Sequence, residues 1–349
     1  MKHSTIYYAP GVFAAWPANG GIWNWGDEIL VCFAIGRYRE YPDTHCIDRD
    51  SPIEYGLARS LDGGETWSVD TDPEINRVSR RRVVPLPPTG LPFGDAGFAL
   101  KVGTAAVTIK STTFVVTRDR GVTWEGPYAL PGADATMTSR TDYIVHGPGS
   151  CTLFLSHAPT AEERMTRGDR VFAWRTDDGA RSWTRLGYLT SDEPRAVMPS
   201  TVLLADGRFI SALRRRLDSP ATRTATNSRN WIEIRESTDG GRSWSFVSEA
   251  ADTGGKNGNP PAMAQTTDGR LVLAYGYRGD RPSIKARISD DAGRTWGEEI
   301  ILRDGARMHD IGYPRMVVRT DGTVVTVYYF TTAERPEQHI CATTWDVPR

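Results

Sequence analysis

The stretch "ESTDGGRSW", from Glu236 to Trp244, places a tryptophan directly after a turn crowded with Asp, Gly and Arg. Four relatives occur along the chain: "SLDGGETW" (60–67), "TRDRGVTW" (117–124), "TDDGARSW" (176–183) and "SDDAGRTW" (289–296). All five fit Ser/Thr-x-Asp-x-Gly-x-Ser/Thr-Trp, except that Ala180 replaces the glycine of the third copy. Because the five tryptophans recur at steps of 52 to 61 residues, the chain is a series of repeats of one structural unit.

Each copy follows a short β-rich run, such as "TFVVTR" or "SIKARIS", so it predicts a hairpin turn. Ser and Asp oxygens can accept hydrogen bonds from the turn N–H groups, Gly supplies positive φ, and Trp packs against a neighbouring sheet. Five equivalent copies indicate repeated architecture rather than catalysis by these aspartates. If the tryptophans are buried, replacing one with Ala should cost about 3–5 kcal/mol.

A second periodicity defines the rest of the unit. "MPSTVLLADGR", "PPAMAQTTDGR" and "YPRMVVRTDGT" align without gaps and place Pro199, Pro261 and Pro314 seven residues before the Asp of a DG turn. A strand-like run follows each turn. The unit is therefore an inner strand, a DG hairpin, a second and a third strand, the Asp-containing turn and an outer strand.

Six such units fit the chain, and the sixth lacks the Asp-containing turn because "HICATTWDV" ends it as a third strand. The N-terminal "STIYY" can supply the missing outer strand and close the ring, which leaves no long free edge. The sequence predicts an all-β, six-bladed β-propeller of four-stranded antiparallel blades. The N-terminal strand closes the last blade, and residues 1–349 form a single domain.

The composition is that of a soluble globular protein, with 39% hydrophobic residues, 24% charged residues and a net charge of −1. It gives no reason to expect binding to nucleic acid or to a membrane. "MKHSTIYYAP" has no apolar signal-peptide core, which favours a cytoplasmic location, or a secreted or periplasmic one if a signal was removed. The four cysteines lie far apart, in neither metal nor redox spacing. We therefore expect no metal and no cofactor.

The repeated turns resemble the Asp-boxes, or BNR repeats, of the sialidase (neuraminidase) superfamily, and the resemblance covers essentially the whole chain. It implies a six-bladed propeller with the boxes on the rim away from the active site. It also implies three arginines that hold the sugar carboxylate, a Tyr nucleophile activated by a Glu, and an Asp acid/base.

The nucleophile is the clearest of these residues. Because all inner strands run the same way around the axis, Met198, Pro260 and Tyr313, which precede the three aligned prolines, should surround one mouth of the central channel. "GYPRMVVRTDGTVVTVYY" resembles the family segment that carries the nucleophilic Tyr, so Tyr313 is the candidate. Met198 stands where the family has Glu, and a phenol needs a proton acceptor. Substitutes could come from His309, Asp310, Glu193 or Glu233.

For the carboxylate, the resemblance assigns Arg214 as the second family arginine and Arg278 or Arg281 as the third. Such contacts are strong and directional. Ala15 occupies the position of the first arginine, and Arg315 or Arg37 could compensate for it.

For the acid/base, the resemblance indicates the loop "RYREYPDTHCIDRDSPIEYG" after the second strand of blade 1. The candidates are Asp43, Asp48 and Asp50, and His45 lies in the same loop. Asp95 resembles another polar site residue of the family. Trp16, with Trp23 and Trp25, offers an aromatic platform for a sugar face.

These residues predict a sialidase-like exo-glycosidase that hydrolyses a terminal, acidic (sialic, ulosonic or uronic) sugar, with a carbohydrate as its partner. One alternative is a polysaccharide lyase on the same propeller, in which Tyr313 and His309 or His45 abstract a proton next to a uronate carboxylate. Another is a noncatalytic propeller that binds glycans or proteins. The oligomeric state is not encoded in these patterns.

Overall fold

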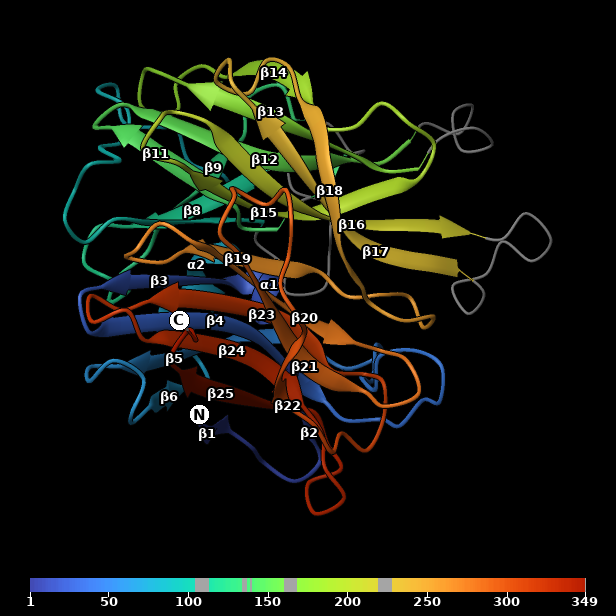
Figure 1. Ribbon diagram of the computed structural model, residues 1–349. Helices are drawn as coiled ribbons and strands as arrows, with labels where there is room; N and C mark the ends of the chain where they lie inside the picture. The colour runs from blue at the N-terminus through green and yellow to red at the C-terminus, as the bar shows by residue number, and fades with distance from the viewer. Residues whose placement is uncertain (104–112, 134–136, 139, 160–167, 219–227, 349) are drawn as a thin grey trace.

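The computed structural model describes residues 1–103, 113–133, 137–138, 140–159, 168–218 and 228–348. It shows an all-β protein whose sheets form the six blades of a β-propeller (Figure 1). The sequence prediction of this architecture is confirmed.

The first three blades come from residues 12–188. Blade 1 contains β2 (Val12–Ala15), β3 (Gly21–Trp25), β4 (Glu28–Arg37), β5 (Glu54–Ser60) and β6 (Ser68–Asp70). Blade 2 contains β7 (Ala99–Val102), β8 (Thr113–Thr117) and β9 (Glu125–Ala129). Blade 3 contains β10 (Met137–Thr138), β11 (Tyr143–Gly147), β12 (Ser150–His157), β13 (Arg170–Thr176) and β14 (Thr184–Tyr188).

The other three blades follow the predicted four-strand order. Blade 4 contains β15 (Arg195–Leu203), β16 (Phe209–Asp218), β17 (Ser228–Ser237) and β18 (Ser245–Asp252). Blade 5 contains β19 (Pro261–Gln265), β20 (Leu271–Tyr277), β21 (Ser283–Ser289) and β22 (Ile300–Arg303). Blade 6 contains β23 (Gly312–Val318), β24 (Val324–Phe330), β25 (His339–Trp345) and the N-terminal β1 (Lys2–Tyr7).

The N-terminal strand closes the ring, as predicted. β1 pairs antiparallel with β25, from Lys2 opposite Thr344 to Thr5 opposite Cys341. The two chain ends therefore lie in the same blade, and Figure 1 shows both termini there.

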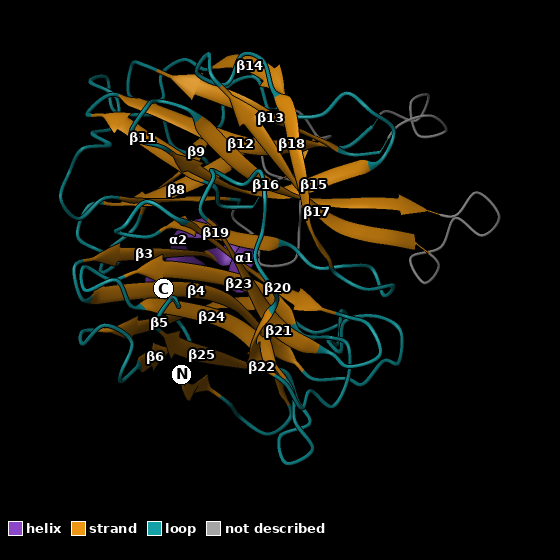
Figure 2. Ribbon diagram, in the orientation of Figure 1, coloured by secondary structure: helices purple, strands orange, loops and turns teal. Residues whose placement is uncertain are grey.

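Blades 1 and 3 are less regular than the sequence repeat predicts. In blade 1 the short helix α1 (Pro17–Gly20) divides the inner strand into β2 and β3, both of which pair with β4. In blade 3 two short strands, β10 and β11, both pair with β12. Among the described residues the only other helix is α2 (Glu74–Ser79), and Figure 2 shows how little of the molecule is helical. Neither of these two helices could span a membrane.

The Asp-boxes are self-contained hydrogen-bonded turns. In the fourth box, Asp239 Oδ1 accepts bonds from the backbone N–H of Arg242 at 3.0 Å and of Ser243 at 2.9 Å. The Ser243 and Ser237 hydroxyls donate to the same carboxylate. Hydrogen bonds to Ser243, followed by those to Ser237 and Arg242, lower the pKa of Asp239 to about 2. The carboxylate is thus committed to the turn, which supports the architectural interpretation of the boxes.

Ala180 is strained in its box. It adopts φ 71°, whereas glycine occupies this left-handed position in the other four boxes, for example Gly241 at φ 93°. A side chain in that region is disfavoured by about 1–2 kcal/mol, and glycine also adds entropy to the unfolded chain. Ala180→Gly should therefore raise the free energy of unfolding by about 0.5–1 kcal/mol, measured by urea denaturation. A decrease would show that the Ala180 methyl contributes more packing than its strain costs.

The box tryptophans are less buried than the pattern suggests. Trp124 is buried and meets Trp23 edge to face at 6.0 Å, but Trp244 is only half-buried, stacked on Phe209 at 6.1 Å. Trp124→Ala should cost about 3–5 kcal/mol of stability, whereas Trp244→Ala should cost about 2 kcal/mol. Leu61→Ala, at a box side chain that is 72% exposed, serves as the control in the same denaturation experiment. Equal losses for all three variants would contradict a packing role.

Candidate active site

Tyr313 and Met198 occupy equivalent positions at the start of their inner strands. Both adopt left-handed backbone conformations, with φ 47° and 55°, at irregularities of strand pairing just before Pro314 and Pro199. Left-handed backbone at non-glycine residues persists only where the surroundings enforce it. Asn259 does so for Tyr313: its Oδ1 accepts from Tyr313 N at 2.8 Å and its Nδ2 donates to the backbone oxygen of Ile311.

Two predicted arginines meet at the Tyr313 phenol. Arg214 Nη1 donates to Tyr313 Oη at 3.2 Å and lies 3.5 Å from Met198 Sδ, while Nη2 donates to the backbone oxygen of Asn257. The guanidinium carbon of Arg278 lies 5.5 Å from the centre of the Tyr313 ring. Both arginines are almost fully buried. The structure therefore brings together residues that are up to 99 positions apart.

Arg278 keeps part of its guanidinium available. Its Nε and Nη2 donate to the backbone oxygen of Ile311, and Nη2 also donates to Tyr329 Oη at 2.6 Å and lies 3.6 Å from Asp310. Within the described residues, Nη1 makes no hydrogen bond or ion pair. Since Arg278 lines a pocket, Nη1 can bind an anion there.

These cations change the acidity of Tyr313. Burial by itself raises the pKa of the phenol, but Arg214, His45, Arg278 and Arg140 favour the phenolate and lower the pKa to about 7. The ordinary value is about 10. Met198, at the position of the family's Glu, accepts no proton, so positive charge activates this phenol.

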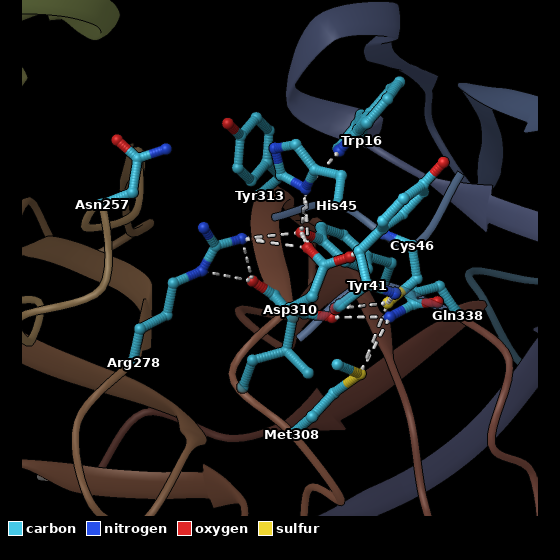
Figure 3. Close-up of polar contacts among 12 residues, drawn as sticks. Trp16, Tyr41, His45, Cys46, Asn257, Arg278, Met308, Asp310, Tyr313 and Gln338 are labelled. Carbon is cyan, nitrogen blue, oxygen red and sulfur yellow. Dashed lines mark hydrogen bonds and ion pairs between the residues drawn. The ribbon is translucent and has the colours of Figure 1, made fainter. Parts of the chain in front are cut away.

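His45 and Asp310 form a buried pair beside Tyr313 (Figure 3). His45 Nδ1 lies 2.6 Å from Asp310 Oδ1, and the His45 ring meets the Tyr313 ring edge to face, with centres 5.7 Å apart. Tyr329 Oη donates to Asp310 at 2.5 Å and Cys46 N donates at 3.0 Å. Burial raises the pKa of Asp310, but His45, Arg278 and Tyr329 outweigh it and lower the pKa to about 2. Asp310 is therefore an ionised carboxylate inside the protein.

His45, Arg278 and Asp310 line one side of a small pocket of about 30 Å³. Tyr313 and Arg214 are not among its described lining residues, but the Tyr313 ring contacts His45 edge to face. The lining comes from four segments: the loop after β4, the loop between β18 and β19, the loop after β20 and the segment before β23. Its residues are Asp43, Thr44, His45, Lys256, Asn257, Arg278, His309 and Asp310.

The three candidate aspartates of the blade 1 loop separate in space. Only Asp43 lines the pocket, where its carboxylate lies 3.7 Å from Lys256. Asp48 is turned into its own loop, accepting from Ser51 Oγ at 2.9 Å. Asp50 is 93% exposed and lies 3.9 Å from Arg39. Of the three, the geometry therefore favours Asp43.

His309 also lines the pocket, where burial, followed by Arg278 and Lys256, lowers its pKa to about 4. Trp16 is buried behind His45, at 5.0 Å between ring centres, so it supports the imidazole and presents no open face to a sugar.

Other predicted residues lie elsewhere. Arg315 donates to the backbone oxygens of Ala18 and Thr141, so it fixes α1 against blade 3. Glu233 is paired with Arg235 at 2.7 Å. Four further candidates are exposed and, within the described residues, do not line the pocket: Arg37, Arg281, Asp95 and Glu193.

Sequence reasoning missed four supporting residues. Asn259 holds the backbone at Tyr313, Tyr329 holds Asp310, Arg140 contributes to the field on the phenol, and Asn257 binds Arg214. Asn259 directly precedes the aligned segment "PPAMAQTTDGR", which was the one signal that could have identified it.

The family comparison agrees with the repeat. Residues 94–326 match the family model described as "BNR repeat-like domain". This match confirms the BNR repeats recognised in the sequence, and the structural neighbours with the same fold include sialidases. No curated protein matches the sequence.

Solved structures share the fold at low identity. A Dyadobacter fermentans protein of unknown function superposes with a TM-score of 0.72 at 20% identity, covering 99% of this chain and 98% of that one. A Penicillium chrysogenum α-L-arabinanase in complex with arabinobiose gives 0.63 at 16%, covering 99% and 98%. An intramolecular trans-sialidase from Ruminococcus gnavus, in complex with oseltamivir carboxylate, gives 0.55 at 13%, covering 99% and 97%. At such identities the likeness shows the fold alone, a glycosidase-like propeller.

Proposed function

Because the chain belongs to the BNR repeat-like family, we propose that it is a glycoside hydrolase that removes a terminal acidic sugar, with Tyr313 as the nucleophile. The observation that carries this proposal is the contact of Arg214 Nη1 with Tyr313 Oη at 3.2 Å, beside Arg278. A phenol with its pKa lowered to about 7 is substantially ionised at neutral pH, and the phenolate is the nucleophilic form.

The same cations favour an acidic substrate. Arg278 and Lys256 both line the pocket, so a carboxylate would find two positive groups there. Arg214 is the second candidate, and its Nη2 would exchange the Asn257 carbonyl for a carboxylate oxygen. A carboxylate held this way fixes the anomeric carbon relative to Tyr313 Oη, and such positioning lowers the barrier.

The proposal is tested with a panel of fluorogenic glycosides that carry a sialic, ulosonic or uronic acid, together with neutral arabinofuranosides of equal leaving group. We expect turnover of at least one acidic glycoside and at least 10-fold lower kcat/KM on the neutral ones, which is the effect of losing one charged contact of about 1.4 kcal/mol. Faster cleavage of a neutral sugar would contradict the carboxylate assignment. Saturable glycan binding without any turnover would favour a noncatalytic propeller.

One observation also favours the lyase alternative. Tyr313 and His45 stand edge to face beside Arg278, and a phenolate or imidazole next to a neutralised uronate carboxylate can abstract its α-proton. Polyuronates incubated with the protein distinguish the two reactions. Elimination gives an unsaturated product that absorbs in the far ultraviolet, whereas hydrolysis gives reducing sugar without that absorbance.

A further inference from the structure

Hydrolysis by Tyr313 needs a second group that protonates the leaving oxygen. The resemblance places an Asp of the blade 1 loop in that role, and Asp43 is the one that reaches the pocket. Its side chain is 67% exposed and paired with Lys256 at the rim. The neighbouring His45 lies deeper, with 16% of its side chain exposed, directly beside Tyr313.

The orientation of His45 is fixed by its partner. Asp310 is ionised, so the proton in the 2.6 Å contact with His45 belongs to Nδ1. Asp310 cannot turn away, because Tyr329 Oη, Cys46 N and Arg278 hold it from three sides. Trp16 packs edge to face against the imidazole at 5.0 Å, and its indole N–H lies 3.4 Å from Nδ1, a longer contact than the one with Asp310. Figure 3 shows the second ring nitrogen, Nε2, on the side of Tyr313.

We infer that His45, positioned by Asp310 through Nδ1, is the acid/base residue of this site and presents Nε2 to the glycosidic oxygen. This inference rests on the proposed hydrolase function. An imidazole is suited to the task because it exchanges a proton near neutral pH, and a carboxylate behind it stabilises the imidazolium. The arrangement follows the general logic of a base oriented by a third group.

The reaction has two steps, formation and hydrolysis of a sugar linked to Tyr313. Tyr313 Oη forms a bond to the anomeric carbon while the glycosidic C–O bond breaks, and the leaving oxygen takes the proton of His45 Nε2. An alcohol departs, leaving neutral His45 and a Tyr313-linked sugar. Water then attacks the anomeric carbon and gives a proton to Nε2, and Tyr313 leaves as the phenolate. The net reaction adds one water.

Charged groups of both signs surround the His45–Asp310 pair. Asp310 contributes one negative charge, and the Tyr313 phenolate contributes another. Arg278, Arg214 and Arg140 contribute positive charge around the phenol, and Arg278 lies 3.6 Å from Asp310 itself.

The activity test compares leaving groups. His45→Gln should lower kcat/KM by about 100-fold or more on a glycoside with an alkyl leaving group, and by less than about 10-fold on one with a dinitrophenyl group, which needs no proton. Azide, a nucleophile that needs no base, should restore turnover of the dinitrophenyl glycoside. His309→Gln, at the other histidine of the pocket, should show no dependence on the leaving group. An equal loss of His45→Gln on both glycosides would overturn the assignment.

A second readout does not need a substrate. In ¹⁵N spectra of the histidine rings, with His45→Gln identifying the signal, neutral His45 should carry its proton on Nδ1. Asp310→Asn should abolish that preference. A proton found on Nε2 would overturn the assignment even if the enzyme is active. If the wild-type protein cleaves no glycoside at all, both the hydrolase proposal and the role of His45 are wrong. If the wild-type protein is active but His45→Gln loses the same kcat/KM on the alkyl and the dinitrophenyl glycoside, only the role of His45 is wrong.

Discussion

Tyr313→Phe should reduce turnover of the best acidic glycoside by about 10³-fold or more, since the substitution removes the nucleophilic oxygen and keeps the ring. The ring stays in place, because its contacts with His45 and Tyr329, at 5.7 and 5.9 Å between centres, do not involve the hydroxyl. The loss should therefore appear in kcat more than in KM. Kinetics on the fluorogenic glycoside measure it.

Tyr328→Phe is the matched control for this prediction. It removes the same hydroxyl group from β24, the strand that pairs with β23. The Tyr328 hydroxyl is hydrogen-bonded to Thr343 Oγ1 at 2.6 Å, and Tyr328 is fully buried and does not line the pocket. We expect about 1 kcal/mol lower stability and unchanged turnover. Retention of the wild-type rate by Tyr313→Phe would contradict the nucleophile assignment.

The titration of Tyr313 provides a second prediction for the same variant, in the pH dependence of its stability. The folded-state pKa, about 7, is below the unfolded value of 10, so ionisation stabilises the folded protein. This contribution is fully present above pH 10 and is lost as the pH falls through 7. The free energy of unfolding of the wild-type protein relative to Tyr313→Phe should therefore rise between pH 7 and pH 10. A constant difference across this range would show that the arginines do not stabilise the phenolate.

Much of the fold could be read from the sequence because the repeat fixes the backbone. The Asp-boxes and DG turns give the strand order, and alignment of Met198 with Tyr313 places both at one mouth of the ring. Arg214 follows from the same logic, since it lies on the second strand of the same blade as Met198. These inferences need only the period of the chain and the antiparallel pairing of neighbouring strands.

The remaining site residues depend on features that periodicity does not encode. His45 and Asp310 are 265 positions apart and meet only because loops of blades 1 and 6 bend over one pocket. Arg315 is two residues from Tyr313 and would share its face in a regular strand, but the irregularity between Gly312 and Arg315 breaks that alternation. The choice among Asp43, Asp48 and Asp50 was open for the same reason, since a loop has no register to read.

Asp310→Asn should lower the stability of the protein as strongly as the loss of a buried box tryptophan. The substitution removes the one negative charge that His45 and Arg278 share, at 2.6 and 3.6 Å, in a region where Arg278 and Asp310 are each about 2–3% exposed. Removing one partner of such a buried pair leaves a charge without compensation and costs about 3–5 kcal/mol. Urea denaturation at pH 7 measures this loss. Asp50→Asn, in the blade 1 loop and 93% exposed, should change stability by less than about 0.5 kcal/mol.

The free energy of unfolding measured at acidic pH distinguishes this charge effect from a loss of packing. The folded-state pKa of Asp310, about 2, is below the ordinary 3.8. Its contribution is therefore fully present above pH 3.8 and disappears as the pH falls through 2. The difference in unfolding free energy between the wild-type protein and Asp310→Asn should accordingly shrink over that interval. A difference that persists at the acid end would mean that the asparagine disturbs the packing around Tyr329 and Cys46, because a neutral carboxyl then gains nothing from His45 and Arg278.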